Sequence, residues 1–144
     1  MARTIIESVR EFIKQCPYID ELKNLAVDFL DSDTGYYSIE EVPVSPILKT
    51  YIDGSSERQF VFVFASRFDW NEEAENNISN CGFFENFQNW LEKCSDNDIL
   101  PGLPDTMTAS AIEATTSGYL YGVDPSGRHA RYQIQCTLYY HKEN

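Results

Sequence analysis

An unbroken apolar run from Phe60 to Ala65 constrains the fold of this chain more than any other feature. Successive residues of a strand point to opposite faces, so the even-numbered phenylalanines would face one way and Val61, Val63 and Ala65 the other. A buried helix could also be apolar throughout, but this run is short, aromatic and β-branched, and it follows a Gly-Ser turn. We therefore expect the central strand of a sheet, with helices on one face and more of this chain or a neighbouring subunit on the other.

The length and composition fit one folded domain spanning residues 1–144. A chain of 144 residues can bury a substantial core, and 42% of its residues are hydrophobic. The formal net charge of −12 argues against a protein that clamps DNA or RNA, because such proteins neutralise phosphates with clustered Lys and Arg. Two explanations of the acidity stay open, which are simple solubility and a surface that nucleic acid passes without binding.

The cysteines are far apart in the sequence and form no C-x-x-C pair. The N-terminal sequence lacks the apolar core of a signal peptide, and no apolar run approaches the length of a membrane span. We therefore expect free, buried thiols in a protein that is made in a reducing cytoplasm and has no membrane partner. These cysteines are Cys16, Cys81, Cys94 and Cys136.

An amphipathic helix is predicted near the N-terminus. Apolar residues from Ile5 to Cys16 recur at the spacing of one helical face. Thr4-x-x-Glu7 can form a capping box at its start, and Pro17 ends it. The apolar stripe of this helix must cover another apolar surface.

A second stripe with the same spacing follows Gly82 and runs from Phe83 to Cys94. The polar segment before it, residues 71–80, begins near the cap signal Asp69-x-x-Glu72 and is expected to form a separate short, solvated helix. The chain therefore provides a central helix, or a helix pair, in addition to the N-terminal one.

Two pairs of strands are predicted around the central strand. Leu25–Leu30 and Tyr37–Glu40 flank the turn-rich segment Asp31–Gly35, which we interpret as a hairpin. Residues 108–121 and the alternating segment 130–140 are joined by Gly122–Gly127, which predicts a long terminal hairpin. The odd-numbered positions of the last strand, including Gln133 and Gln135, would form a polar, solvated face. The fold class is therefore α+β, a mainly antiparallel β-sheet with an N-terminal helix and a central helix, or helix pair, packed on it.

Motifs for catalysis, metals and cofactors are missing from the sequence. It contains no H-E-x-x-H, Walker A or G-x-G-x-x-G pattern. His129 and His141 fall on the polar parity of the last strand, away from any nucleophile signature. Asp31–Gly35 alternates oxygen ligands as a calcium loop does, but it lacks the distant bidentate Glu and fits a hairpin turn better. We expect no catalytic, cofactor or metal site, which favours a binding or assembly role.

Several segments together resemble a family of small bacteriophage and prophage proteins from Gram-positive hosts, usually labelled minor capsid proteins. The resemblance covers nearly the whole chain and is weakest before about Leu25. It is carried by the segments Tyr37–Lys49, Tyr51–Gln59, Phe62–Arg67, Asn80–Phe84, Thr116–Leu120 and Ala130–Cys136.

The resemblance implies a structural role in a phage virion, for a protein made in the cytoplasm of the bacterial host. Proteins of this kind look like tail terminators or tail-completion proteins, which form a ring between the tail tube and the head connector. The implied partners are other copies of this chain in a ring homo-oligomer, possibly a hexamer, together with the tail tube and head connector proteins. DNA would be passing cargo. The implied fold, a sheet flanked by helices, agrees with the α+β prediction, and the family offers no catalytic residues to carry over.

The segment from Glu41 to Asp53 is the candidate contact between subunits. Pro43 and Pro46 interrupt any strand ladder there, although a short strand at residues 51–52 is expected. Apolar residues in this segment have few partners left within the chain, and closed rings need head-to-tail contacts. The alternative is that the segment folds back over the edge of its own sheet. The candidate contact residues are Val44, Ile47, Leu48 and Tyr51.

Two other functions remain open from the sequence. A small-molecule- or peptide-binding accessory domain could use an aromatic surface formed by Tyr36, Tyr51 and Tyr119. An enzyme whose site follows no recognised motif is the third possibility. A ring protein would be oligomeric, at least when concentrated or with its partner, whereas a binding module would be monomeric and stabilised by its ligand.

Overall fold

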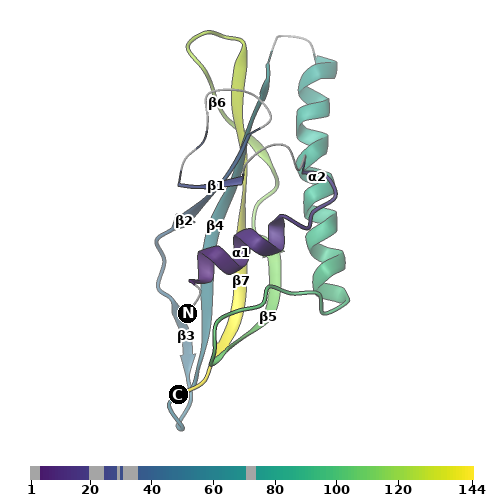
Figure 1. Ribbon diagram of the computed structural model, residues 1–144. Helices are drawn as coiled ribbons and strands as arrows, with labels where there is room; N and C mark the ends of the chain where they lie inside the picture. Colours follow the sequence, from purple (N-terminus) through teal and green to yellow (C-terminus); the bar gives the residue numbers. More distant parts are fainter. Residues whose placement is uncertain (1–3, 20–24, 29, 31–35, 71–73) are drawn as a thin grey trace.

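The fold is α+β, as the sequence predicts: a mixed, mostly antiparallel seven-stranded sheet with an N-terminal helix and a central helix packed on it (Figure 1). The computed structural model describes residues 4–19, 25–28, 30, 36–70 and 74–144. In chain order the elements are α1 (Ile5–Ile13), β1 (Leu25–Val27), β2 (Tyr37–Val42), β3 (Ile47–Thr50), β4 (Ser56–Asp69), α2 (Ala74–Asp96), β5 (Met107–Ala114), β6 (Tyr119–Val123) and β7 (His129–Lys142).

Two long antiparallel strands, β4 and β7, form the centre of the sheet. They pair over their whole length, from Ser56 opposite Lys142 to Asp69 opposite His129. The outer edge of β4 carries β2 and then β3, while the outer edge of β7 carries β5 and β6. As a result, β3 and β6 lie on opposite edges and at opposite ends of the sheet (Figure 1).

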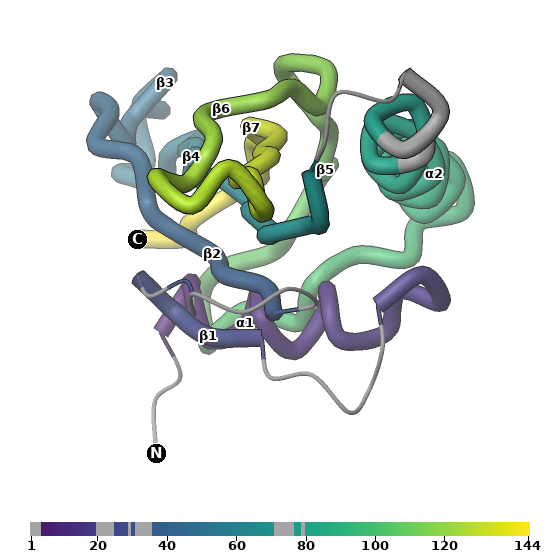
Figure 2. The backbone as a smooth tube through the Cα atoms, turned by 90° about the horizontal axis from the view of Figure 1, so that it is seen from above, coloured from purple at the N-terminus to yellow at the C-terminus, as the bar shows by residue number. Residues whose placement is uncertain are grey.

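The core lies between one face of the sheet and both helices (Figure 2). The even-numbered residues of β4 and β7 point into it, and Phe62 and Phe64 are fully buried as predicted. The Phe64 ring stacks on the Phe87 ring of α2, with centroids 4.5 Å apart. The Phe12 ring of α1 lies 5.1 Å from the ring of Trp90, so the two helices also contact each other.

Helix α1 begins where the sequence predicts. The side-chain oxygen of Thr4 accepts a hydrogen bond from the backbone N–H of Glu7 at 3.2 Å, which satisfies one of the free amides of the first turn. Val9, Phe12 and Ile13 are buried, so the predicted stripe is the face that covers the sheet.

Of the two options, a central helix or a helix pair, the structure has the single helix: residues 74–80 are helical, but they are not a separate helix. The predicted cap residue Glu72 lies outside the described residues. Helix α2 is continuous and passes through Gly82, where an added Cβ would meet no atom within 4 Å. A glycine inside a helix costs about 1 kcal/mol relative to Ala, which is less than the burial of the Phe84, Phe87 and Leu91 side chains provides. Burial of the aromatic stripe therefore overrides the local weakness at Gly82.

The prediction of a hairpin between the first two strands is also wrong, because β1 and β2 pair in parallel. Leu25 lies opposite Tyr37, and the backbone N–H of Asp28 continues the ladder by donating to the carbonyl of Ile39 at 2.9 Å. The Nε of Arg10 donates to the Leu25 carbonyl at 2.7 Å and so ties β1 to α1. The predicted turn and calcium-like segment, residues 31–35, lies outside the described residues.

The predicted terminal hairpin is formed by β6 and β7. Its turn is closed by a hydrogen bond of 2.9 Å from the Gly127 N–H to the Asp124 carbonyl, and Gly127 takes a φ of 71°. The segment predicted as one strand from 108 to 121 is two strands, β5 and β6. The chain bends between them where a Cβ on Gly118 would lie 2.2 Å from the Cβ of Phe84.

The second face of the sheet, opposite the helices, is partly buried as well. Val61, Val63 and Ala65 are buried there, as is Gln133, which the sequence placed on a solvated face. The amide of Gln133 donates to the Tyr119 hydroxyl at 2.6 Å and accepts from the Nε of Arg131 at 2.9 Å. The prediction of a fully solvated odd-numbered face is therefore wrong at Gln133, because Tyr119 of β6 and Arg131 of the same strand supply hydrogen-bond partners. It is also wrong at Thr137, which is 3% exposed.

Candidate intersubunit contact

The backbone of the candidate contact segment lies along the edge of its own sheet. Strand β3 pairs antiparallel with residues 56–58 of β4, with a bulge between Ile47 and Lys49. The Gln59 N–H donates to the carbonyl of Pro46, and the Gln59 side chain donates to the carbonyl of Ser45, both at 2.9 Å. The sequence predicted a short strand at residues 51–52, but the strand is formed by Ile47–Thr50, and residues 51–52 belong to the turn after it.

The side chains of this segment do not join the core. All four residues of β3 are exposed, and the neighbouring apolar residues are exposed as well. The relative exposures are Val44 41%, Ile47 44%, Leu48 52%, Tyr51 38% and Ile52 108%. These five residues form what we call the β3 surface, which contains all four residues predicted as the candidate contact. Its backbone is held by the subunit itself, while its apolar side chains face outwards.

A tight turn presents the far end of the β3 surface. The Tyr51 N–H donates to the Ser55 carbonyl at 2.8 Å, and Gly54 adopts a φ of 91° that favours glycine. The Asp53 carboxylate accepts hydrogen bonds from the Ser55 hydroxyl at 2.6 Å and from the Ser55 N–H at 2.9 Å. These two bonds stabilise the charged form and lower the pKa of Asp53. The turn therefore has a defined shape, with Ile52 at its tip.

The Tyr51 side chain is held between charged neighbours. Its hydroxyl lies 3.5 Å from the carboxylate of Glu57, which is also 2.7 Å from the Nδ1 of His141. The ammonium of Lys49 lies 5.0 Å from the centre of the Tyr51 ring. A side chain positioned before binding loses less conformational entropy when a partner covers it.

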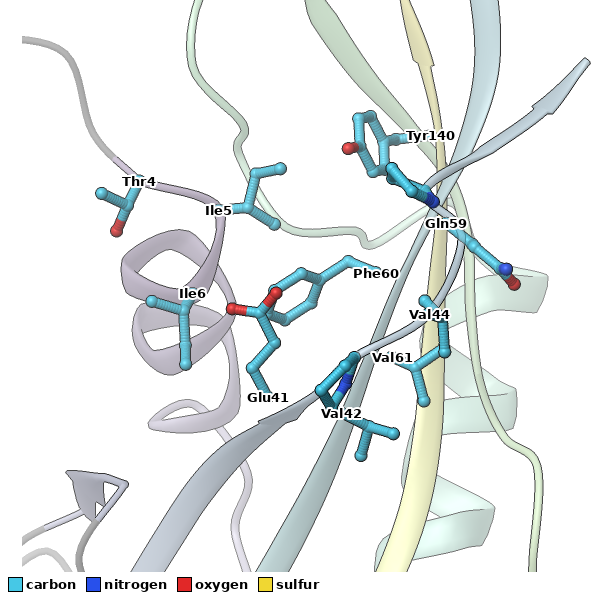
Figure 3. Close-up of a pocket in the computed structure, with 12 residues that line it drawn as sticks. Thr4, Ile5, Ile6, Glu41, Val42, Val44, Gln59, Phe60, Val61 and Tyr140 are labelled. Atoms are coloured by element: carbon cyan, nitrogen blue, oxygen red, sulfur yellow. The ribbon is translucent and has the colours of Figure 1, made fainter.

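A groove of about 620 Å³ adjoins the β3 surface (Figure 3). It lies at a gap in the edge of β4, because β2 ends opposite Val61 and β3 begins opposite Arg58. Phe60 lies at its centre, between α1 and the segment that follows β2 (Figure 3). The lining residues are Thr4, Ile5, Ile6, Glu41, Val42, Pro43, Val44, Pro46, Gln59, Phe60, Val61 and Tyr140. Such a lining suits apolar side chains of a partner or ligand.

The two histidines, which the sequence analysis considered as possible catalytic residues, each lie beside a carboxylate. His141 contacts Glu57, and His129 lies 3.6 Å from the carboxylate of Asp69. Among the residues that the structure describes, no group of three or more His, Cys, Asp or Glu side chains is arranged to hold a metal ion. The described helices also include none long and apolar enough to cross a membrane.

The cysteines are free, and three of the four are buried as predicted. Cys81 is the exception, since it lies exposed on α2. Burial raises the pKa of the Cys16 thiol to about 11, and it also raises the pKa values of Cys94 and Cys136. The buried thiols therefore behave as apolar core residues.

The three tyrosines of the alternative binding surface do not come together. Tyr51 lies beyond β3, near the Ser56 end of β4, whereas Tyr119 lies on β6, which pairs with β7 near Gln133 (Figure 1). Tyr36 immediately precedes β2. Tyr51 and Tyr119 therefore belong to opposite ends of the sheet and form no single aromatic surface.

The exposure of one apolar strand, β6, was not predicted from the sequence. Every residue of β6 is exposed, although four of its five residues are large and apolar. The signal was present in Tyr119-Leu120-Tyr121, where both parities are apolar in a strand that follows a bend. The same pattern in the central strand marks burial, so pattern alone does not separate a buried strand from an exposed apolar edge.

Comparisons with protein-family models and curated proteins identify no family for this chain. No protein-family model matches the chain, and no curated protein matches it either.

Proposed function

We propose that this chain is a non-enzymatic structural protein of the head–tail junction or tail of a bacteriophage, a minor capsid protein acting as a tail-terminator or tail-completion ring. The observation that carries the proposal is the β3 surface, an apolar patch on a strand fixed to the subunit's own sheet. Apolar patches of this kind mark contacts with other proteins. The family resemblance supplies the setting, and the α+β fold agrees with the one it implies.

Self-assembly explains why the β3 surface is apolar and lies on a strand paired with β4. A ring subunit must offer its neighbour a surface that exists before contact, and β3 is held by its ladder to β4. The partners in this proposal are other copies of the chain, the tail tube and the head connector.

The acidity fits passage of DNA through such a ring. With −12 per chain, a ring of six copies would carry roughly −70, and an acidic wall repels phosphate. DNA is then cargo that slides past the protein without being held.

The test changes Ile47 and Leu48 together to Asp and measures native mass and melting temperature. Both side chains are exposed, so the monomer should keep its stability while the assembly becomes smaller. The matched control changes Ile78 and Ile99 to Asp, because these are exposed isoleucines outside the β3 surface. A loss of stability with unchanged mass would instead place the segment in the core of the monomer.

The groove beside Phe60 favours a second candidate function, a small-molecule- or peptide-binding accessory domain. Its volume of about 620 Å³ is within the range of ligand pockets, roughly 300–1,000 Å³. This candidate predicts a monomer whose melting temperature rises with a ligand, and a ring protein predicts an oligomer. Measuring the native mass of the wild-type protein over a range of concentrations distinguishes the two.

A further inference from the structure

Strand β6 is a short apolar edge strand with a bulge between Leu120 and Gly122, and it has no charged residue or Pro. It pairs only with β7 among the described strands, and its five residues are all exposed. Natural edge strands are normally guarded by charged residues, especially Lys, or by Pro. Strand β6 has neither, and its sequence is Tyr-Leu-Tyr-Gly-Val. We call the exposed residues Tyr119, Leu120, Tyr121 and Val123 the β6 surface.

Side chains of the neighbouring strand β7 contact the two tyrosines of the β6 surface. The Tyr119 hydroxyl accepts a hydrogen bond of 2.6 Å from the side chain of Gln133, and the Arg131 guanidinium lies 5.1 Å from the centre of the Tyr121 ring. Arg131 is itself fixed by a 2.8 Å ion pair with Glu40. These contacts prepare the aromatic side chains for a partner, since their orientations are already set.

The exposed apolar side chains of the protein concentrate in two places. Nine of the thirteen large hydrophobic side chains that are exposed among the described residues belong to the β3 surface or the β6 surface. The two surfaces lie on opposite edges and at opposite ends of the β4–β7 pair (Figure 1). Two different surfaces on one subunit are what a head-to-tail contact requires, because each copy then contacts one neighbour with each.

The chain segments that carry the two surfaces differ in formal charge. The β6–β7 hairpin from Tyr119 to Arg131 has a formal charge of +1, while the segment from Glu41 to Glu57 has −2. The hairpin charges are Asp124, Arg128 and Arg131, and those of the other segment are Glu41, Lys49, Asp53 and Glu57. Pairing unlike surfaces therefore places the more acidic β3 segment against the less acidic hairpin, whereas pairing two β3 surfaces would bring two acidic segments together.

We propose that the occupant of the β6 surface is a second copy of this chain, whose β3 surface docks against it. The outer edge of β6 in one copy runs beside the outer edge of β3 in the next, which extends the sheet across the boundary. Apolar side chains of both strands then leave water together. This inference rests on the self-assembly in the proposed function and adds which two surfaces meet.

The test mixes two variants that each lack one surface. Variant one carries Ile47→Asp and Leu48→Asp, and variant two carries Leu120→Asp and Val123→Asp. Each variant should be monomeric alone at a concentration where the wild type is oligomeric. The reason is that each contact between two copies of the same variant lacks either an intact β3 surface or an intact β6 surface. Mixed in equal amounts, they should form a heterodimer and nothing larger, since one intact contact remains. Native mass spectrometry reads both results directly, and a cooperative thermal unfolding transition confirms that each variant is folded.

Crosslinking tests the same contact without disrupting it. In a Cys81→Ser background, which removes the exposed thiol, Leu48→Cys and Leu120→Cys copies should form disulfides with each other but not with themselves. An oligomeric wild type together with an unaffected second variant, or with disulfides between like copies, would overturn the docking and leave the proposed function standing. A wild type that is monomeric at every concentration would overturn the self-assembly on which both rest.

Discussion

At the residue scale, Gln133 links the polar second face of the sheet to β6. It is 6% exposed, and its amide bridges the Tyr119 hydroxyl and the Arg131 guanidinium. Removing one member of a buried hydrogen-bonded set leaves the remaining groups without partners.

Replacing Gln133 with Ala should therefore lower the free energy of unfolding by about 1–3 kcal/mol. Gln135 is the control, because it has the same parity on β7 and is only half-buried. Its replacement with Ala should cost under about 0.5 kcal/mol. Urea denaturation measures both values, and equal small losses would mean that the second face is solvated at both positions.

The thiols give a second prediction at this scale. Ellman's reagent at pH 8 should label Cys81 rapidly and the other cysteines only on unfolding, because burial raises the pKa values of Cys16, Cys94 and Cys136. A Cys81→Ser variant should show no rapid label. Two or more fast thiols in the wild type would contradict the burial of these residues.

The same shifts set the sign of the alkaline pH dependence. Below the ordinary thiol pKa of 9.0 the buried cysteines are protonated in the folded and unfolded states alike. Their full contribution to the free energy of unfolding is therefore present in that pH range. Above it the unfolded chain releases protons that the folded protein keeps. Stability should therefore fall as the pH rises from about 9 towards the pKa of Cys16, about 11.

At the scale of elements, α2 is a long helix that keeps a glycine in its interior. Gly82 has open space where a Cβ would stand. Gly82→Ala should raise the free energy of unfolding by about 0.5–1 kcal/mol, because Ala loses less backbone entropy in a helix. Thermal or urea unfolding measures the gain.

Gly118 is the matched control for this substitution. An added Cβ there would lie 2.2 Å from the Cβ of Phe84, so Gly118→Ala should destabilise the protein. A loss of stability at Gly82 as well would indicate a break in α2 at that residue.

Some of the helices and strands could be predicted from the sequence, and others could not. The α+β class, the start of α1 and the central strand followed from periodicity, capping and the apolar run, which are local signals. The direction of β1 did not, because Leu25 turns the same face to the core in a parallel or an antiparallel pair. Gly82 was misread because burial of a distant stripe outweighed local propensity. The β3 surface was predicted from its apolar residues, whereas the β6 surface was missed, since exposure depends on tertiary structure.

At the scale of the whole molecule, charge predicts the behaviour towards nucleic acid. The protein should not retard duplex DNA in a gel even at low salt, where non-specific binding is strongest, because its net charge is −12. A basic protein of similar size serves as the positive control. A clear shift of the DNA would point to a connector that contacts DNA and would contradict the passive passage proposed here.

We propose that this chain is a structural protein at the junction of phage head and tail. The most direct test is electron microscopy of virions released from cells that carry its gene, labelled with a gold-conjugated antibody against the protein. We expect label on intact particles, concentrated where the tail meets the head. Purified, infectious virions that contain none of this protein would contradict it.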